Sequence, residues 1–202
     1  MALVTFCKIL KEGLNGLKMT YFSSRRDHYG YIDKTSEVKT PVYGPKQNVY
    51  IYEHCGINIG AKFICNSGKF IMKHNCSVGP CLTVITCNHE YDKIGIIPET
   101  NNWGDLYSDE VLVNDSVWIG ANVTLCPGTI IGRGCIVAAG SVCVRSHEYP
   151  SYSVIGGNPA KFIKFRLTLD EQKQQEIMMY KEIDRISLDT LISNYNRFSK
   201  TK

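Results

Sequence analysis

The sequence lacks the features that mark several common classes of protein. It has no run of the ~20 apolar residues that a membrane-spanning helix needs, and its apolar start is interrupted at Lys8, so we expect neither a signal peptide nor a membrane span. The net charge is only +4 over 202 residues, and no basic helix or row of stacking aromatic residues accompanies it, which argues against a nucleic-acid partner. The pair Gly132 and Gly134 lies in no βαβ pattern and is not a dinucleotide fingerprint.

The nine cysteines include no CxxC pair, so neither a zinc ribbon nor a thioredoxin-like redox motif is indicated. Several of them fall in the repeat described next, where Cys135 takes a position that suits a compact apolar side chain. We therefore expect reduced thiols and a cytoplasmic protein.

What the sequence does contain is a six-residue repeat. Aliphatic residues recur at every sixth position, and a compact residue follows four positions after each of them. This period fits neither a helix nor a simple strand, and it is typical of a β-helix in which each unit is one short strand plus its turn. The aliphatic positions are Val113, Ile119, Leu125, Ile131 and Val137, and the compact ones are Val117, Val123, Thr129, Cys135 and Ser141.

The six-residue step also occurs earlier in the chain. It runs from Ile51 to Phe63 and again from Met72 to Val84, and the register slips at a bulge near Lys69. The sequence therefore predicts at least two regular blocks of one continuous solenoid.

The chain divides into three expected parts. Residues 1–30 are expected to be an N-terminal helical segment, 31–166 the β-helix with a loop insertion at 88–110, and 167–202 a helical tail. Thr168 and Glu171 have the spacing of a capping box, which opens the tail helix. A long insertion in a solenoid usually maps to its binding face.

Four segments of the repeat region carry a specific resemblance. They are 117–120, 126–128, 138–142 and 157–161, which read VWIG, CPG, AAGSV and GNPAK. Together they resemble the hexapeptide-repeat acyltransferases, among them sugar, capsule and antibiotic O-acetyltransferases, and the resemblance covers residues 50–168. It implies an all-β solenoid, a left-handed parallel β-helix with short N-terminal and C-terminal helices. It also implies a homotrimer that uses acetyl-CoA.

Acetyl transfer to a hydroxyl needs a base that works near neutral pH, for which histidine is suited. His89 lies where a repeat block ends and the insertion begins, in a Thr-x-x-His segment similar to the one that carries the catalytic histidine of the family. We therefore predict His89 as the general base. By the same resemblance Asn88 is expected to bind the acceptor. Asp92, in preference to Glu90, is expected to orient His89 or to hold sugar hydroxyls, and a solvated charged loop is the alternative for both carboxylates. An acyl intermediate on Cys87 is the less favoured alternative, because its position in the repeat predicts an inward thiol.

The other four histidines are expected on the solvated surface. His28 follows the basic N-terminal stretch, His147 precedes Pro150, and His54 and His74 occupy turn-like positions. A zinc site made of His54, His74 and His89 would require separations of ~18 on one face of a solenoid. The separations are 20 (74 − 54) and 15 (89 − 74), so we predict no metal site.

The donor site is predicted from the resemblance. Trp118 is too large to point into the coil, so it must point outward, where it is expected to line the active site or to contact another subunit. Small residues are expected to contact the pantetheine arm and cations the adenosine phosphates, with a basic solvated edge as the alternative. The expected residues are Ala121, Ala139, Gly140, Ser141, Arg145, Pro159, Lys161 and Lys164.

These observations predict an acetyl-CoA-dependent O-acetyltransferase that acts on a carbohydrate hydroxyl by direct transfer to the acceptor. A streptogramin or chloramphenicol acetyltransferase is the alternative within the same class of enzyme. A non-catalytic β-helix subunit that scaffolds polysaccharide assembly is the alternative from another class.

Overall fold

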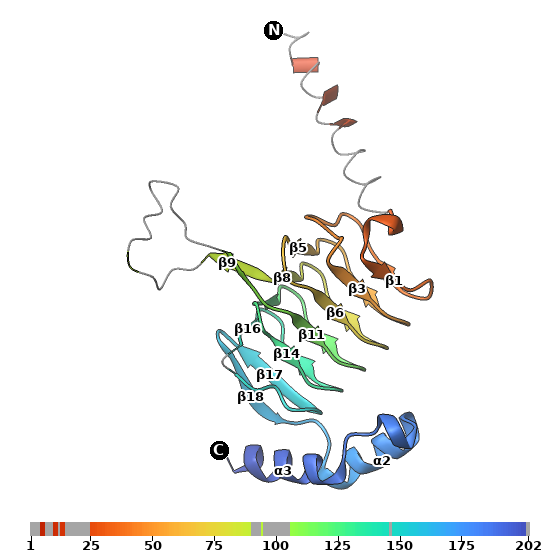
Figure 1. Ribbon diagram of the computed structural model, residues 1–202, viewed down its shortest axis with the longest axis vertical. Coiled ribbons are helices and arrows are strands. Elements are labelled where there is room, and N and C mark those ends of the chain that lie inside the picture. The colour runs from red at the N-terminus through yellow and green to blue at the C-terminus, as the bar shows by residue number, and fades with distance from the viewer. Residues whose placement is uncertain are drawn as a thin grey trace.

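Short strands joined by turns wind into a parallel β-solenoid with helices at its C-terminal end (Figure 1). The computed structural model describes residues 25–89, 94, 106–145 and 147–200, together with Thr5, Phe6, Leu10, Lys11, Gly13 and Leu14. Those six N-terminal positions have helical backbone, and most of the predicted N-terminal helical segment lies outside the described residues.

Each complete coil contributes one strand to each of three sheets, named here sheets A, B and C in the order in which the chain visits them, and all strands in them are parallel except β18. Sheet A consists of β1 (Tyr31–Ile32), β3 (Val49–Ile51), β6 (Phe70–Met72), β11 (Val111–Val113) and β14 (Ile130–Ile131). Sheet B consists of β2 (Glu37–Val38), β4 (Gly56–Ile57), β7 (Ser77–Val78), β12 (Trp118–Ile119), β15 (Ile136–Val137), β17 (Ser153–Gly157) and β18 (Ala160–Phe165). Sheet C consists of β5 (Lys62–Ile64), β8 (Thr83–Ile85), β13 (Thr124–Leu125) and β16 (Val142–Cys143).

Three corners separate the sheets, and they are named here after the sheets they join. The chain turns from sheet A to sheet B at the A–B corner, from B to C at the B–C corner, and from C to the next coil at the C–A corner. The register slip expected near Lys69 is a longer turn at the C–A corner, residues 65–69, between β5 and β6.

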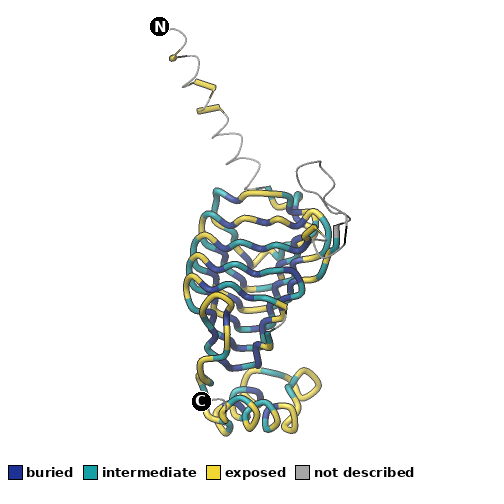
Figure 2. Tube along the Cα trace, turned by 90° about the vertical axis from the view of Figure 1, so that its left-hand side faces the viewer, coloured by how far each residue is buried: buried dark blue, intermediate teal, exposed yellow. Residues whose placement is uncertain are grey.

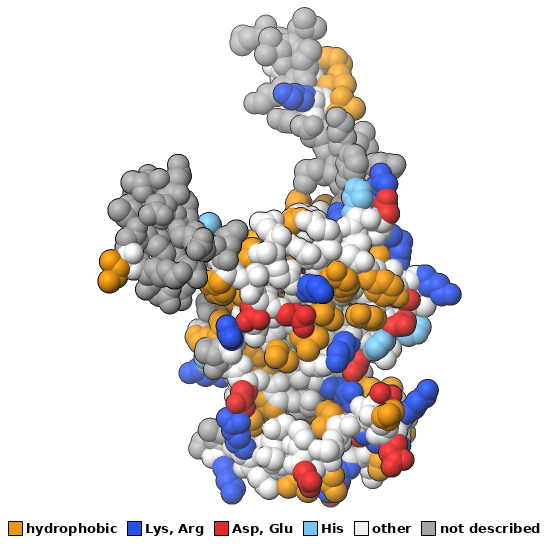
Figure 3. Space-filling model, viewed as in Figure 1, with side chains coloured by type: hydrophobic (Ala, Val, Ile, Leu, Met, Phe, Trp, Pro, Cys, Tyr) orange, Lys and Arg blue, Asp and Glu red, His pale blue; other side chains and the backbone are white. Residues whose placement is uncertain are grey.

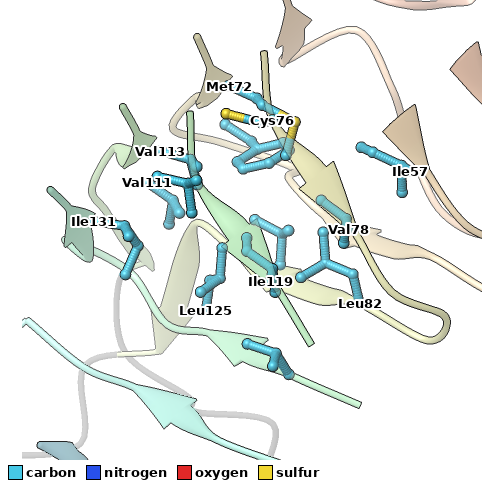
Figure 4. Close-up of a cluster of buried hydrophobic side chains, with 14 of the residues drawn as sticks. Ile57, Met72, Cys76, Val78, Leu82, Val111, Val113, Ile119, Leu125 and Ile131 are labelled. Atoms are coloured by element: carbon cyan, nitrogen blue, oxygen red, sulfur yellow. The ribbon is translucent and has the colours of Figure 1, made fainter. Parts of the chain in front are cut away.

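The six-residue repeat places one aliphatic side chain of each strand inside the coil. Ile119, Leu125 and Ile131 come from sheets B, C and A in turn, and all three are fully buried. The compact positions four residues later are buried as well, including the polar Thr129 and Ser141. Figure 4 shows these aliphatic side chains meeting in a continuous column, and Figure 2 shows buried residues alternating with exposed ones along every coil. The repeat prediction is therefore confirmed.

A hairpin leaves the solenoid at the C–A corner. Its two strands, β9 (Cys87–His89) and β10 (Leu106–Ser108), pair antiparallel. The insertion predicted at 88–110 begins within β9 and ends two residues after β10. The solenoid register resumes at β11, which pairs with β6 of the preceding coil, so the insertion leaves the stacking of the coils unchanged.

The C-terminal part begins with the predicted capping box. The Thr168 side chain accepts a hydrogen bond from the Glu171 backbone, and the Glu171 carboxylate accepts one from the Thr168 backbone. Helix α2 (Leu169–Met179) follows, then the 3-10 turn η3 (Glu182–Asp184) and helix α3 (Leu188–Ser199); η1 (Arg26–His28) is a 3-10 turn near the first coil. Leu191 of α3 is buried, and α3 also stacks Tyr195 on Phe165 of β18. None of the helices in the described part of the chain is long and apolar enough to span a membrane.

Candidate active site

His89 is the last residue of β9, at the point where the hairpin leaves the C–A corner. Its side chain is exposed, and its backbone N–H donates to the Asn88 side-chain oxygen at 2.9 Å. Cys87, the first residue of the strand and two positions before His89, is buried, as its position in the repeat predicts. The strand thus separates an inward thiol from an outward imidazole that a substrate can reach. Asp92 lies outside the described residues.

The base of the hairpin is fixed by contacts to the coils on either side. The Asp109 backbone N–H donates to the Thr86 carbonyl at 2.9 Å, which closes the base, and the buried Thr86 hydroxyl donates to the Ser67 carbonyl at 2.5 Å. Arg145, two coils further along the chain, forms an ion pair with Asp109 at 3.1 Å. His89 is therefore carried by a stem whose base is held to the solenoid.

The residues expected at the donor site lie mostly at another corner. Ala121, Ala139 and Gly140 are in the turns of the B–C corner, and Trp118 points outward from sheet B with 56% of its surface exposed, as predicted. The coils come close together at this corner, because a Cβ added to Gly120 would lie 2.6 Å from the Ala139 nitrogen. Small residues are therefore required here by the fold itself.

Lys161 and Lys164 are exposed on β18, the edge strand of sheet B, and Pro159 is exposed in the turn that precedes it. Arg145 does not join them, because it follows β16 at the C–A corner. Ser141 does not face outward either. It is fully buried, and its hydroxyl donates to the Ala138 carbonyl at 2.6 Å, so its side chain secures the turn from inside.

The exposed residues at the B–C corner and on strand β18 fit the groups of a coenzyme A molecule. Ala139 and Gly140 are exposed, and no atom lies within 4 Å of a Cβ placed on Gly140, so a narrow chain can approach the backbone there. The exposed ammonium groups of Lys161 and Lys164 on the adjoining strand suit phosphates.

One histidine has contacts that the sequence did not predict. His74 is exposed, as expected, but it lies between two carboxylates at the A–B corner. Its Nδ1 is 2.8 Å from Asp115 and its Nε2 is 2.8 Å from Glu53, and both nitrogens can donate only when the ring is protonated. The two carboxylates belong to the coils on either side of His74. Contacts between side chains of different coils could not be predicted from the spacing of residues in the sequence.

Among the described residues, no group of three or more His, Cys, Asp or Glu side chains is arranged to hold a metal ion. The described cysteines are all free thiols, and apart from exposed Cys81 and half-buried Cys126 they are buried.

Sequence comparison assigns the repeat region to a known family. Residues 110–145 match the model described as bacterial transferase hexapeptide (six repeats). Residues 110–145 thus carry the hexapeptide repeat of that family. A protein named "Probable macrolide acetyltransferase" from Lysinibacillus sphaericus is 41% identical to this hexapeptide-repeat chain over 118 residues, which cover 58% of this chain and 60% of that protein. The galactoside O-acetyltransferase of Escherichia coli K12 is 27% identical over 143 residues, which cover 69% of this chain and 65% of that protein.

Solved structures show the same fold. The crystal structure of a maltose O-acetyltransferase from Clostridium difficile 630 superposes with a TM-score of 0.61 and 28% identity, and the match covers 71% of the hexapeptide-repeat chain and 73% of that chain. A hexapeptide-repeat acetyltransferase of Vibrio cholerae O1 biovar eltor, complexed with acetyl coenzyme A, has a TM-score of 0.63 at 24% identity, covering 71% and 74% of the two chains. The two curated relatives named above are matched over slightly less than two thirds of their length.

Proposed function

We propose that this chain is an acetyl-CoA-dependent O-acetyltransferase that acts on a carbohydrate hydroxyl, with His89 as the general base. The observation that carries the proposal is the placement of His89, an exposed imidazole at the root of a hairpin that leaves an acetyltransferase-type solenoid. The galactoside and maltose O-acetyltransferases to which the chain is similar act on sugars, which favours a sugar acceptor.

His89 acts on the acceptor. As the acceptor oxygen attacks the thioester carbonyl carbon, the imidazole removes the hydroxyl proton, the new C–O bond forms and the C–S bond breaks. The proton then passes from the imidazolium to the departing thiolate, so that the enzyme ends the cycle unchanged. Acetyl-CoA supplies the activated acyl group, and Ala139, Gly140, Lys161 and Lys164 are the residues proposed to hold it. Asn88 and Asp92 are proposed to bind the acceptor.

An antibiotic acceptor is the second candidate. The 41% identity to a protein named for macrolide acetylation favours it, and the exposed His89 suits a sugar attached to a macrolide as well as a free one. A non-catalytic scaffold is disfavoured by the exposure of His89 together with that of Lys161 and Lys164.

We further propose a homotrimer. Within one chain His89 lies at the C–A corner, whereas the proposed donor residues Ala139 and Lys161, together with Trp118, lie on sheet B and at the B–C corner. Sheet C therefore separates His89 from the donor residues. An active site that uses both is completed by a second copy of the chain.

The surface of the solenoid suits contacts between copies, because it exposes apolar side chains that include Trp118 (56%) and Ile130 (58%). Figure 3 shows hydrophobic side chains among charged ones across the face that carries β3, β6 and β11. The free thiols support the expected cytoplasmic location.

The test is thiol release from acetyl-CoA by the wild type and by His89→Asn, with nucleotide sugars, free sugars, macrolides, streptogramins and chloramphenicol as acceptors. We expect His89→Asn to lower kcat by about 10²- to 10⁴-fold, which is the usual contribution of a general base. The matched control is His54→Asn, because His54 has φ +57 at the A–B corner and asparagine tolerates that backbone.

Thiol release that requires both His89 and a sugar acceptor supports the carbohydrate hypothesis. Thiol release that requires His89 and an antibiotic supports the second candidate. Full activity of His89→Asn would show that another group takes the proton. No thiol release with any acceptor, together with no binding of acetyl-CoA by calorimetry, would favour the non-catalytic scaffold.

A further inference from the structure

Asp109 and Arg145 meet at the C–A corner although the chain separates them by two full coils. Their positions differ by 36 (145 − 109), which is two coils of three hexapeptides. The Arg145 Nη1 lies 3.1 Å from Asp109 Oδ2. Asp109 is the residue at which the chain returns from the hairpin to the solenoid, since its backbone N–H bonds to Thr86 and β11 begins two residues later.

The space around this ion pair is closed on two sides by glycines. Gly68, with φ +73, lies so close to the hairpin base that a Cβ there would be 2.7 Å from the Thr86 oxygen and 2.9 Å from the Asp109 oxygen. On the other side a Cβ at Gly128 would be 2.8 Å from Asp109 Oδ2 and 2.9 Å from the Arg145 side chain. The base of the hairpin is therefore enclosed by the coils before and after it.

The remaining carboxylate oxygen of Asp109 is also engaged. Its Oδ1 accepts a hydrogen bond from the Glu110 backbone N–H at 2.9 Å, which shapes the turn into β11. One side chain thus contacts both the returning backbone and a cation from two coils away.

We propose that the ion pair between Asp109 and Arg145 is a positioning device that holds the stem carrying His89 at the angle needed for acetyl transfer. The inference rests on the proposed function of His89, and it assigns Arg145 to the hairpin rather than to the donor phosphates. An ion pair in which 72% of the arginine and 33% of the aspartate side chain is exposed adds little to global stability, so its effect is expected in the geometry of the stem. A small displacement of a catalytic group costs much more in rate than in stability.

The test compares Asp109→Asn, Arg145→Met and the double variant in steady-state kinetics. Each single variant is expected to lower kcat by about 3- to 10-fold while KM for acetyl-CoA stays within about twofold, and the double variant is expected to be no worse than either single one. Arg145→Lys, which keeps the charge, is expected to recover part of kcat. If Arg145 instead binds phosphate, Arg145→Met will raise KM for acetyl-CoA, Asp109→Asn will leave it unchanged, and the proposal is overturned.

Amide hydrogen exchange tests the same inference without any activity. Exchange at 87–89 and 106–108 is expected to accelerate in both single variants and to stay at the wild-type rate in Arg197→Met. Arg197 forms a comparably exposed ion pair with Glu148 from helix α3, at 2.6 Å, and neither residue belongs to the stem. Unchanged exchange in Asp109→Asn and Arg145→Met would refute the positioning role. Accelerated exchange in a protein that transfers no acetyl group would uphold the ion pair while the proposed function fails.

Discussion

At the scale of single residues, the inward positions of the solenoid hold thiols as well as aliphatic side chains. Burial raises the pKa of Cys65 and Cys135 to about 11 and that of Cys143 to about 12, compared with an ordinary value of 9.0. The cause in each case is the loss of water around a group that would have to become a thiolate. These residues therefore serve as compact apolar side chains only while they remain protonated.

Stability is expected to decline at alkaline pH for this reason. A thiol whose pKa is higher in the folded chain than in the unfolded chain stabilises the fold fully below about pH 9, and that contribution is lost as the pH rises from 9 towards 11 or 12. Urea unfolding at a series of pH values is expected to show a falling midpoint above pH 9. Cys143→Ala removes one such group, so its stability should fall less steeply with pH than that of the wild type. Parallel slopes for the two proteins would show that Cys143 does not contribute.

At the scale of elements, helix α2 packs against the solenoid through polar side chains. Glu176 is almost fully buried and accepts hydrogen bonds from Arg133 at 2.7 Å and from the Ile186 backbone at 2.9 Å, and the Tyr152 hydroxyl also donates to it. Arg133 in turn lies over the Tyr180 ring, 3.8 Å from its centroid, and pairs with Asp115 at 3.3 Å. The helix is thus connected through Asp115 to His74 of the neighbouring coil.

Removing this carboxylate is expected to detach the C-terminal helices. Glu176→Ala leaves buried Arg133 without its closest partner and should lower the free energy of unfolding by about 3 kcal/mol, the lower end for a broken buried pair because Asp115 remains. Glu182→Ala, at an exposed position in η3, should change it by less than about 0.5 kcal/mol. Urea denaturation measures both. Equal effects would mean that the buried carboxylate contributes no more than a surface one.

The same helix shows what the sequence could and could not predict. The capping box at Thr168 predicted its start, because capping depends on residues three positions apart. The buried face was not predictable, since Gln172 and Glu176 point inward while Ile177 and Met178 are 61% and 80% exposed. That orientation follows from Arg133, which comes from a distant coil.

The solenoid was predictable for the opposite reason, because every inward position repeats at a fixed spacing. For the candidate site, the sequence predicted roles for His89 and Trp118, both of which are exposed in the structure, but it did not single out Asp109. The 36-residue separation of Asp109 from Arg145 equals two coils of 18 residues, but spacing alone does not show that the two side chains meet across those coils.

At the scale of the whole molecule, the separation of His89 from the B–C corner makes a prediction about assembly. If one copy supplies His89 and the next supplies the donor groove, two inactive variants can complement each other. Ala139→Trp would cover the small exposed surface at the B–C corner with an indole, and His89→Asn would remove the base. Co-refolding the two in equal amounts is expected to restore about one quarter of the wild-type activity, because about one interface in four then joins two intact surfaces.

Light scattering before and after mixing provides the control for assembly. Both single variants should have the mass of the wild-type oligomer. Complete inactivity of a correctly assembled mixture would place both groups in the same copy.

The antiparallel strand β18 has a consequence for how the chain behaves at high concentration. A parallel ladder that ended at β17 would present the same edge that each coil offers to the next, and another molecule could extend it into a fibre. In this chain β18 turns back and pairs with β17 in the opposite direction, with a shift in register between Val154 and Ile155 and with Lys161 and Lys164 exposed along it. The strand proposed to bind phosphates therefore also terminates the repeat, and it keeps a self-complementary architecture from polymerising through this end.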